Sequence, residues 1–353
     1  MPAPAHNRPI RVMLVDDSAV VRSLIARALS DDPAIQVVAT ANDGQEAVNI
    51  ATNTMLDAII LDIEMPGMDG LTALPKLRAL APKTSIIIAS SLTERNVEIT
   101  MKALALGASD IVAKPSSRDE GALQYFFAEL KQKLHVLLGK PGMGTSALAA
   151  LPVEEKRIVR TLGKPEAIAI AASTGGPNAL LTLCEGLRGH FSHVPVFITQ
   201  HMPATFTKAF AEHLHKASGA PCMEATDKLS VQAGHIYVAP GNYHMLVESI
   251  DGHRVLRLNQ DPPENFCRPA ADPMLRSLAK IYGPRLMVLV LTGMGSDGLL
   301  GARAVAEAGG RIFAQDAASS TVWGMPKAIS EAGIAEAVLP LTEMIPLLKE
   351  AMS

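Results

Sequence analysis

Short runs rich in isoleucine, valine and alanine alternate with longer amphipathic segments along nearly the whole chain. Each run is short enough for a β-strand that is buried on both faces, as in a parallel sheet. The first expected strands are Ile10–Val15, Ile35–Ala39, Ala58–Asp62, Ser85–Ala89 and Asp110–Ala113. The helices expected between and after them are Ala19–Leu29, Gly44–Asn49, Gly70–Leu80, Asn96–Leu106 and Gly121–Leu138. This alternation predicts a doubly wound α/β domain.

The alternation breaks once, in the middle of the chain. From Gly139 to Gly163 glycine, proline, alanine and serine dominate before a charged cluster, which is typical of a linker. The expected strands after it are Ala167–Ala172, Val194–Thr199, His235–Ala239, Leu286–Leu291 and Ile312–Ala314, and Met245–Leu258 alternates like a hairpin around Asp251-Gly252. We therefore predict α/β domains at residues 8–130 and 164–350, the second also doubly wound with a mainly parallel sheet, and a linker at 131–163.

The composition indicates packed domains in a reducing compartment. Hydrophobic residues make up 48% of the chain and charged residues 19%, which excludes disorder as the dominant state. No apolar run approaches the ~18–20 residues of a membrane span, and the N-terminal segment lacks the apolar core of a signal peptide. The three cysteines lie far apart without a CxxC pair, which favours a cytoplasmic location. The net charge of −3 is spread over both halves, so we expect no nucleic-acid partner.

Acidic side chains follow two strands of the first predicted domain. Asp16 and Asp17 come after the first strand, and Asp62 ends the third. Because strand ends line one crevice in a parallel sheet, these carboxylates should converge and suit a hard cation such as Mg²⁺. With Ser90 and Lys114 at the next two strand ends, the set suits phosphoryl transfer onto an aspartate. The alternative is that Asp16 and Asp17 merely cap the following helix.

Residues 10–130 resemble the response-regulator receiver domain, a doubly wound, flavodoxin-like fold. The resemblance rests on LVDDS, LDIEMPGMDG, AS and AKP at the ends of the first, third, fourth and fifth expected strands. It implies that Asp62 accepts a phosphoryl group, that Ser90 is the switch hydroxyl and that Lys114 pairs with the phosphate. The Mg²⁺ ligands that it implies are Asp16, Asp17, Asp62 and the backbone carbonyl of Glu64. Ile111 stands where many receivers have the switch aromatic, so coupling through an aromatic rotamer is not expected.

Three polar residues of the second predicted domain also follow strands and precede helices. Ser173 follows the strand Ala167–Ala172 and opens STGGP, in which the glycines permit a tight turn and the proline suits a first helical turn. His201 closes the next strand, and Asp297 lies in TGMGSDG after a later strand. If these ends share one crevice, the histidine can accept the serine proton while the aspartate orients the imidazole. The backbone N–H of Met294 could face a developing oxyanion.

Other interpretations of these residues stay open at this point. Ser173 could simply cap its helix. Most other histidines fall on a helix flank or in loops, whereas His235 and His244 are harder to dismiss as the base. The glycine-rich TGMGSDG could instead bind a phosphate at a helix N-terminus, although no Walker lysine follows it and the GxGxxG pattern is not satisfied.

The segment from Glu166 to Leu348 resembles the catalytic domain of chemotaxis protein-glutamate methylesterases. The matching stretches are AASTGGP, TQHMPATFTKAFAEHL, GHIYVAPGNYH, FCRPAADPML, VLTGMGSDGLLGA and VWGMPKA. The resemblance implies Ser173 as nucleophile, His201 as general base and Asp297 as orienting acid, with Thr174 and Met294 in the oxyanion region. It implies hydrolysis of glutamate methyl esters on methyl-accepting chemoreceptors, and deamidation of receptor glutamines through the same γ-glutamyl acyl-enzyme. A chemotaxis histidine kinase would be the phosphodonor, and ester hydrolysis would need no cofactor.

Two other classes of function remain to be weighed against the enzyme. Receivers often carry DNA-binding outputs, but residues 164–353 hold 15 basic against 17 acidic residues and no helix-turn-helix signature. In a catalytically silent adaptor, the serine, histidine and aspartate would have only structural roles. The sequence favours a phosphorylation-activated hydrolase.

Overall fold

The computed structural model describes residues 8–91, 93–115, 120–138 and 164–352. The chain forms two compact units, which divide between Ala147 and Leu148. Each unit has its own sheet and its own hydrophobic core. Most of the predicted linker, residues 139–163, lies outside the described residues. None of the described helices is long and apolar enough to cross a membrane.

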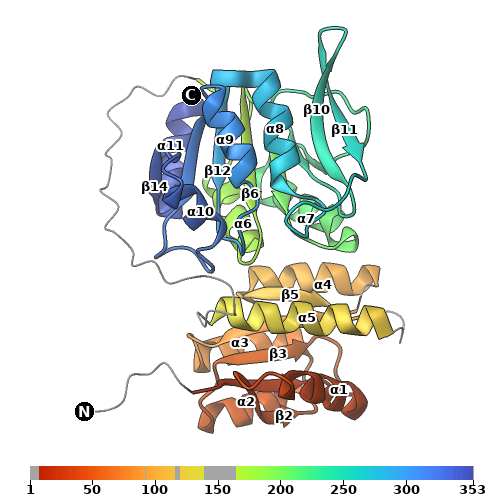
Figure 1. Cartoon of the computed structure of the whole chain (residues 1–353). Helices are drawn as coiled ribbons and strands as arrows, with labels where there is room; N and C mark the ends of the chain where they lie inside the picture. Colours follow the sequence, from red (N-terminus) through yellow and green to blue (C-terminus); the bar gives the residue numbers. More distant parts are fainter. Residues whose placement is uncertain (1–7, 92, 116–119, 139–163, 353) are drawn as a thin grey trace, which may run out of the picture. The chain divides into compact units, whose positions relative to one another are not determined.

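A five-stranded parallel sheet with the order β2-β1-β3-β4-β5 forms the first unit (Figure 1). Its strands are β1 Ile10–Val15, β2 Ile35–Ala41, β3 Ala58–Asp62, β4 Ser85–Ser90 and β5 Asp110–Ala113. Its helices are α1 Ala19–Ser30, α2 Gly44–Asn53, α3 Gly70–Leu80, α4 Glu94–Ala105 and α5 Glu120–Leu137. The predicted doubly wound fold of the first domain is confirmed.

The first four helices begin where a polar side chain accepts a backbone N–H of the first turn. These N-cap residues are Ser18, Asp43, Asp69 and Thr93. Ser18 is the cap of α1, while Asp16 accepts the Ser18 backbone N–H at 2.9 Å. The alternative in which Asp16 or Asp17 caps this helix therefore does not hold.

The core of the first unit extends into the last turns of α5. Leu130 and Leu134 are fully buried and belong to the same core as the strand residues Ile10 and Ile87. The helix continues to Leu137, past the predicted domain boundary at residue 130. Leucines at helical spacing keep these turns on the sheet, so they belong to the first domain and not to the linker.

A seven-stranded sheet forms the second unit, with the order β14-β13-β12-β6-β7-β9-β8 and parallel pairing throughout. Its strands are β6 Ala167–Ala172, β7 Val196–Gln200, β8 Cys222–Glu224, β9 Ile236–Val238, β12 Leu286–Val290, β13 Arg311–Gln315 and β14 Ala337–Leu339. A separate antiparallel hairpin consists of β10 His244–Ile250 and β11 His253–Asn259. The predicted α/β fold and the predicted hairpin are confirmed.

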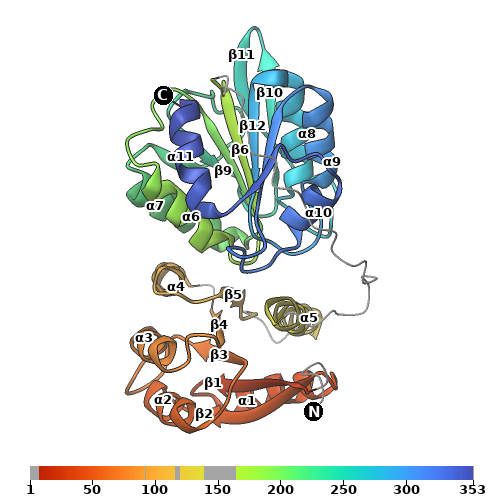
Figure 2. The same cartoon turned by 90° about the vertical axis from the view of Figure 1, so that its left-hand side faces the viewer.

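Helices cover both faces of this sheet: Figure 2 shows α6, α7 and α11 on one side and α8, α9 and α10 on the other. Their bounds are α6 Gly176–Gly186, α7 Ala204–Ser218, α8 Ala271–Tyr282, α9 Leu299–Glu307, α10 Met325–Glu331 and α11 Leu341–Met352, with a short 3₁₀ turn at Gly283–Arg285. The sequence pattern predicts helices at Pro177–Leu187, Thr205–Lys216, Asp272–Tyr282 and Gly298–Ala308, which correspond to α6 to α9, whereas β8, β14, α10 and α11 were not predicted. The two strands have three residues each and α10 has seven, too few to show a clear period, and α11 has Pro346 inside it.

The centre of the second sheet brings three chain segments to one edge. Strands β12, β6 and β7 are neighbours, and Thr292, Ser173 and His201 come within two residues of their carboxyl ends. The Ser173 backbone N–H donates to the Thr292 carbonyl at 3.0 Å, and that of His201 donates to the Ala172 carbonyl at 3.1 Å. These bonds fix the segments beside one another beyond the strands.

Candidate functional sites

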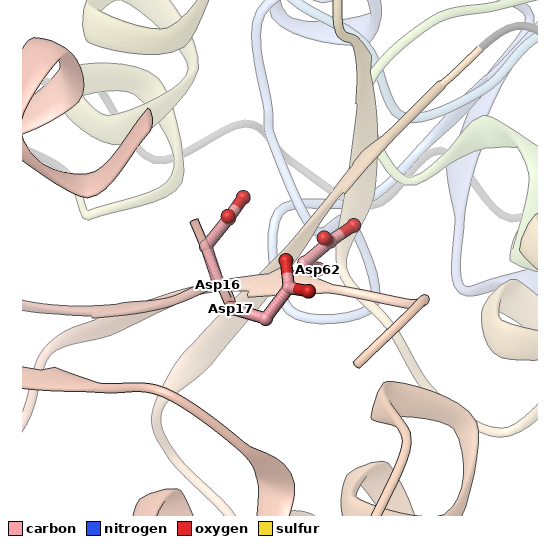
Figure 3. Close-up of side chains that lie close together, drawn as sticks. All are labelled: Asp16, Asp17 and Asp62. Atoms are coloured by element: carbon pink, nitrogen blue, oxygen red, sulfur yellow. The ribbon is translucent and has the colours of Figure 1, made fainter. Parts of the chain in front are cut away.

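Three carboxylates gather at the carboxyl edge of the first sheet (Figure 3). Asp16 and Asp17 follow β1, and Asp62 is the last residue of β3. One oxygen of each side chain lies within 4.8 Å of the other two. Asp16 and Asp62 are buried, whereas Asp17 is exposed. The structure thus brings together the three aspartates that the sequence singled out.

Lys114 follows β5 and lies among these carboxylates. Its Nζ contacts Asp16 Oδ2 at 2.6 Å and Asp62 Oδ2 at 2.8 Å. The other oxygen of Asp62 accepts the Ile63 backbone N–H at 2.8 Å. Burial raises the pKa of Asp62 above its usual value, although the Lys114 charge acts in the opposite direction. A desolvated carboxylate beside an ammonium group suits attack on a phosphoryl group.

The donor set of this cluster fits Mg²⁺, which prefers carboxylate, carbonyl and water oxygens. Asp16, Asp17 and Asp62 supply carboxylate oxygens, and a divalent cation would offset their mutual repulsion. Glu64, whose backbone carbonyl is the fourth predicted ligand, lies two residues after Asp62. The Glu64 side chain accepts an N–H of Asn96 in α4 at 2.9 Å, so it is engaged outside the cluster.

The predicted switch hydroxyl, Ser90, is buried at the end of β4. Its Oγ accepts a hydrogen bond from Thr100 in α4 at 2.9 Å and donates to the Ser91 carbonyl at 3.2 Å. Among the described residues, no hydrogen bond links this hydroxyl to Asp62 or Lys114. Ser90 must therefore change its partners before it can bind a phosphoryl oxygen on Asp62. Ile111 is buried in β5, at the position that carries an aromatic ring in many receivers.

Asp297 is the most fully bonded carboxylate at the edge of the second sheet. It is buried and accepts five hydrogen bonds. The donors are the backbone N–H groups of Ala271, Asp272 and Gly298, Asn265 Nδ2 and His201 Nε2, at 2.6–3.1 Å. Burial acts to raise the pKa of Asp297, but its bonds to His201 and to the first turn of α8 hold that pKa below its usual value. The carboxylate is thus kept ionised and in one orientation.

His201 follows β7, and its side chain is partly buried beside the buried Asp297. Burial, the largest effect, acts to lower the pKa of His201, but its hydrogen bonds to Asp297 and Cys267 and the nearby negative charge raise that pKa above its usual value. His201 Nε2 lies 2.7 Å from Asp297 Oδ2, and Nδ1 lies 3.4 Å from Cys267 Sγ. Because Nε2 is bonded to the carboxylate, Nδ1 is the ring nitrogen that remains for proton exchange.

Ser173 lies directly after β6 and is 9% exposed. Gln200 Nε2 donates to the backbone carbonyls of both Ser173 and His201, at 2.9 and 3.0 Å. The Ser173 Oγ makes no hydrogen bond within the described part of the chain, and contacts of this kind often tighten only when substrate binds. Gly175 is the N-cap of α6, without a side-chain bond, so the alternative that Ser173 caps this helix does not hold.

Two glycines make room for the serine segment. Gly175 has φ +76°, and a side chain there would also collide with Thr321. A Cβ on Gly293 would lie 2.9 Å from the Ser173 Cβ, closer than such atoms approach in real structures. The segments that follow β6 and β12 are therefore in direct backbone contact.

The two predicted oxyanion residues lie in these same segments. Thr174 follows Ser173, and its carbonyl accepts the Thr292 hydroxyl at 2.9 Å. Met294 follows Gly293. Neither the Thr174 nor the Met294 backbone N–H donates a hydrogen bond to any residue that the structure describes. Both groups are therefore available to an oxygen of a bound substrate, near the N-terminus of α6.

The competing histidines, and one N–H of the glycine-rich segment, have other partners. His244 is buried between the Pro262 carbonyl and the Ala270 backbone N–H, each at 3.2 Å, and His235 contacts the Ala233 carbonyl at 3.1 Å. In the glycine-rich segment, the Gly298 backbone N–H already donates to Asp297. That N–H is thus not open to a phosphate.

Sequence reasoning missed three residues that support the second site. Gln200 holds the serine and histidine segments together, Asn265 bridges Asp297 and Asp272, and Asp272 binds the Gly301 backbone N–H at 2.6 Å. Gln200 and Asp272 occur inside the stretches TQHMPATFTKAFAEHL and FCRPAADPML, which were the available signal. An acid in a first helical turn, however, looks like an ordinary helix-dipole partner, so nothing marked Asp272 as buried.

Comparisons with known proteins match both units. A family model described as CheB methylesterase matches residues 168–348, and one described as response regulator receiver domain matches residues 12–124. The chain is 48% identical to protein-glutamate methylesterase/protein-glutamine glutaminase 1 of Rhodospirillum rubrum, over 95% of this chain and 93% of that protein. It is 47% identical to the protein-glutamate methylesterase/protein-glutamine glutaminase of Azospirillum brasilense, over 99% and 94%. The crystal structure of the Thermotoga maritima CheB methylesterase catalytic domain matches 53% of this chain and 98% of its own, with 36% identity and a TM-score of 0.51.

Proposed function

The chain belongs to the CheB methylesterase family and is a phosphorylation-regulated protein-glutamate methylesterase and protein-glutamine glutaminase, and we propose that Ser173, His201 and Asp297 carry out both of its reactions. One observation carries this proposal. A partly buried imidazole bonded to a buried carboxylate, and a serine, lie on segments that follow adjacent strands, and Gln200 ties the serine segment to the histidine segment.

In the proposed mechanism, the Ser173 Oγ attacks the γ-carbonyl carbon of a methylated glutamate, and its proton passes to His201 Nδ1. Asp297, bonded to Nε2, stabilises the imidazolium that forms. The Thr174 and Met294 N–H groups bind the oxyanion. Methanol departs with the proton from His201 and leaves a γ-glutamyl ester on Ser173. Water, deprotonated by His201, then releases glutamate; with glutamine as substrate, the leaving group is ammonia.

We propose that the substrates are methyl-accepting chemoreceptors and that a chemotaxis histidine kinase supplies the phosphoryl group to Asp62. Asp62 is desolvated and lies 2.8 Å from the Lys114 ammonium, which can pair with the phosphoryl oxygens. Asp16, Asp17, Asp62 and the Glu64 carbonyl would hold Mg²⁺, which when bound offsets charge on the transferred group. Ser90 then leaves Thr100 and turns towards the phosphoryl group.

We propose a cytoplasmic location, for which the three free cysteines are the support. Neither a DNA-binding output nor a silent adaptor accounts for the charged pair beside Ser173. A salt-dependent duplex-binding assay tests the first of these alternatives, and labelling by an active-serine probe tests the second.

The deciding experiment measures methanol release from methylated receptor membranes, with and without acetyl phosphate and Mg²⁺. We expect release by the wild-type chain, stimulation by the phosphodonor and no release by Ser173→Ala. Equal release by the wild type and by Ser173→Ala would disprove the assignment of the nucleophile. Release that ignores the phosphodonor would disprove the role of Asp62.

A further inference from the structure

A tight turn directly beside the catalytic pair carries an unexpected aromatic residue. Glu264 and Cys267 pair through backbone hydrogen bonds of 3.2 and 2.9 Å, which leaves Asn265 and Phe266 as the two central residues. Both have positive φ, 51° for Asn265 and 62° for Phe266. Two-residue turns of this kind favour asparagine or aspartate first and glycine second, so phenylalanine is the exception.

The side chains around Phe266 fix this turn to the catalytic groups. Asn265 Nδ2 donates to Asp297 Oδ1 at 3.1 Å and to Asp272 Oδ2 at 2.9 Å. Cys267 Sγ contacts His201 Nδ1 at 3.4 Å. Glu264, which precedes Asn265, forms a bidentate ion pair with Arg276 of α8, at 2.9 and 2.5 Å. The turn is thus held in place by the residues on each side of Phe266.

Phe266 itself contributes nothing to packing. Its exposed fraction is 102%, while the phenylalanines of the domain core, such as Phe197 and Phe206, are fully buried. A phenylalanine with positive φ is sterically unfavourable, and exposure of its ring to water gives no compensating burial. Strained backbone and exposed aromatic rings both concentrate at binding and catalytic sites.

A second exposed apolar residue follows the catalytic segment. Leu300, in the first turn of α9, is 60% exposed. Its neighbour Gly301 donates its N–H to Asp272 Oδ1, and the other oxygen of Asp272 accepts from Asn265. The residues next to Leu300 and to Phe266 are therefore bonded to the same buried carboxylate. We refer to these two exposed residues, Phe266 and Leu300, as the rim of the catalytic edge.

We propose that Phe266, with Leu300, binds the protein substrate beside the reacting glutamate and so determines preference for a folded receptor over a free ester. The inference rests on the proposed function. The occupant follows from continuity with the catalytic edge: the residues on each side of Phe266 contact His201 and Asp297, so a protein with its γ-ester at Ser173 extends over this rim. A small ester has no polypeptide beyond its single glutamate and therefore does not extend to Phe266. Burial of the ring on the receptor would supply the missing apolar contact.

The test compares two substrates with two matched variants of the full chain. The substrates are methylated receptor membranes and a γ-methyl glutamate whose α-amino and α-carboxyl groups are blocked. Phe266→Ala removes the ring, and Ile250→Ala removes a 48% exposed side chain at the tip of the β10–β11 hairpin in the same domain. We expect Phe266→Ala to raise KM for receptor about tenfold with little change in kcat, and to leave the small ester unaffected. Ile250→Ala should match the wild type on both substrates.

Two further variants separate binding from a structural role of the turn. Phe266→Trp should restore the KM for receptor. Phe266→Gly should keep the high KM while raising the unfolding midpoint by about 2–4 °C, because glycine adopts positive φ without steric conflict. Equal losses on both substrates would mean that Phe266 only positions the catalytic groups and would overturn the inference, as would an unchanged KM for receptor in Phe266→Ala.

Co-sedimentation with receptor membranes keeps this inference distinct from the proposed function. A wild-type chain that sediments with receptor but releases no methanol would contradict the proposed function alone. In that case, weaker sedimentation of Phe266→Ala would still support the inference that Phe266 binds the receptor. Sedimentation equal to that of the wild type would overturn it.

Discussion

Asp62 and Asp297 occupy comparable places in two parallel sheets, yet their surroundings differ. Both carboxylates are buried near strand carboxyl ends, where doubly wound folds bind ligands. Asp62 accepts one backbone N–H and contacts one lysine, whereas Asp297 accepts five hydrogen bonds. The pKa of Asp62 is raised and that of Asp297 is lowered.

The difference shows how the same fold edge serves two kinds of chemistry. The oxygens of Asp62 keep unused lone pairs, and its partner Lys114 is a flexible ammonium, which suits the proposed transfer of a phosphoryl group to and from this carboxylate. Asp297 has donors on both oxygens, three of them from the backbone, so it cannot react or turn. In the proposed mechanism it serves instead as a fixed negative charge beside His201. The number and rigidity of the hydrogen-bond donors, more than burial, distinguish Asp62, which is proposed to react, from Asp297, which is proposed to orient His201.

The largest expected effect comes from removing Ser173, the proposed nucleophile of the second domain. Ser173→Ala should lower methanol release from methylated receptor by about 10⁴- to 10⁶-fold, because loss of a triad serine leaves only oxyanion binding and positioning. Labelling of Asp62 by radioactive acetyl phosphate is the control, and it should be unchanged. Activity within about threefold of wild type in a folded variant would disprove the triad assignment.

Neutralising the orienting carboxylate tests whether Asp297 acts through its charge. Asp297→Asn should lower kcat by about 10²- to 10⁴-fold. It should also shift the acid limb of the pH profile of kcat/KM to lower pH. The sign follows from His201: burial lowers the pKa of the imidazole and Asp297 raises it, so loss of the Asp297 charge lowers that pKa. Asp227→Asn, an exposed partner of Arg257, is the control and should leave the profile unchanged.

A shift of that limb to higher pH in Asp297→Asn would contradict this account of His201. So would an unchanged limb together with a large loss of kcat, because that combination would assign Asp297 to structure alone.

A smaller effect is expected from the reacting carboxylate of the first domain. Asp62→Asn should abolish acyl-phosphate formation and the stimulation of methanol release by acetyl phosphate, with basal activity retained. Its removal does not touch the catalytic groups, so only the regulated increment is lost. Asp31→Asn, an exposed carboxylate of the same domain, should be stimulated like the wild type. Normal stimulation of Asp62→Asn, with label on another residue, would show that the acceptor is misassigned.

The sequence was sufficient to predict the first sheet, the five central strands of the second sheet and the edge of each sheet at which a site lies. Buried strands such as Ile10–Val15 and Ala167–Ala172 were predicted with their observed bounds, because β-branched and small apolar runs mark them clearly. Helix α5 was predicted to within one residue at each end, but the end of the first domain was harder to place, since only the packing of this helix ties its last turns to the first core.

The hydrogen-bond partners within the catalytic site could not be predicted from the sequence. The order serine, histidine and aspartate along the chain does not reveal which ring nitrogen of His201 faces the carboxylate, because the ring can rotate on its strand end. Gln200 and Asn265 were missed for a related reason. Their amides act by bridging segments that are distant in sequence, and such a contact leaves no periodic signal.

Cys267 supplies the smallest expected effect and the sharpest test of which group is the nucleophile. Its Sγ lies 3.4 Å from His201 Nδ1, so a thiol contacts the ring nitrogen that the proposed mechanism assigns to the proton of Ser173. If Ser173 is the nucleophile, Cys267→Ala should change kcat/KM by no more than about threefold. The acid limb should move slightly to lower pH, because the sulfur helps to raise the pKa of His201. Cys222→Ala, a free cysteine away from the catalytic pair, serves as the control. A loss in Cys267→Ala as deep as that in Ser173→Ala would assign the acyl-enzyme to sulfur, and mass spectrometry of the trapped intermediate would locate it.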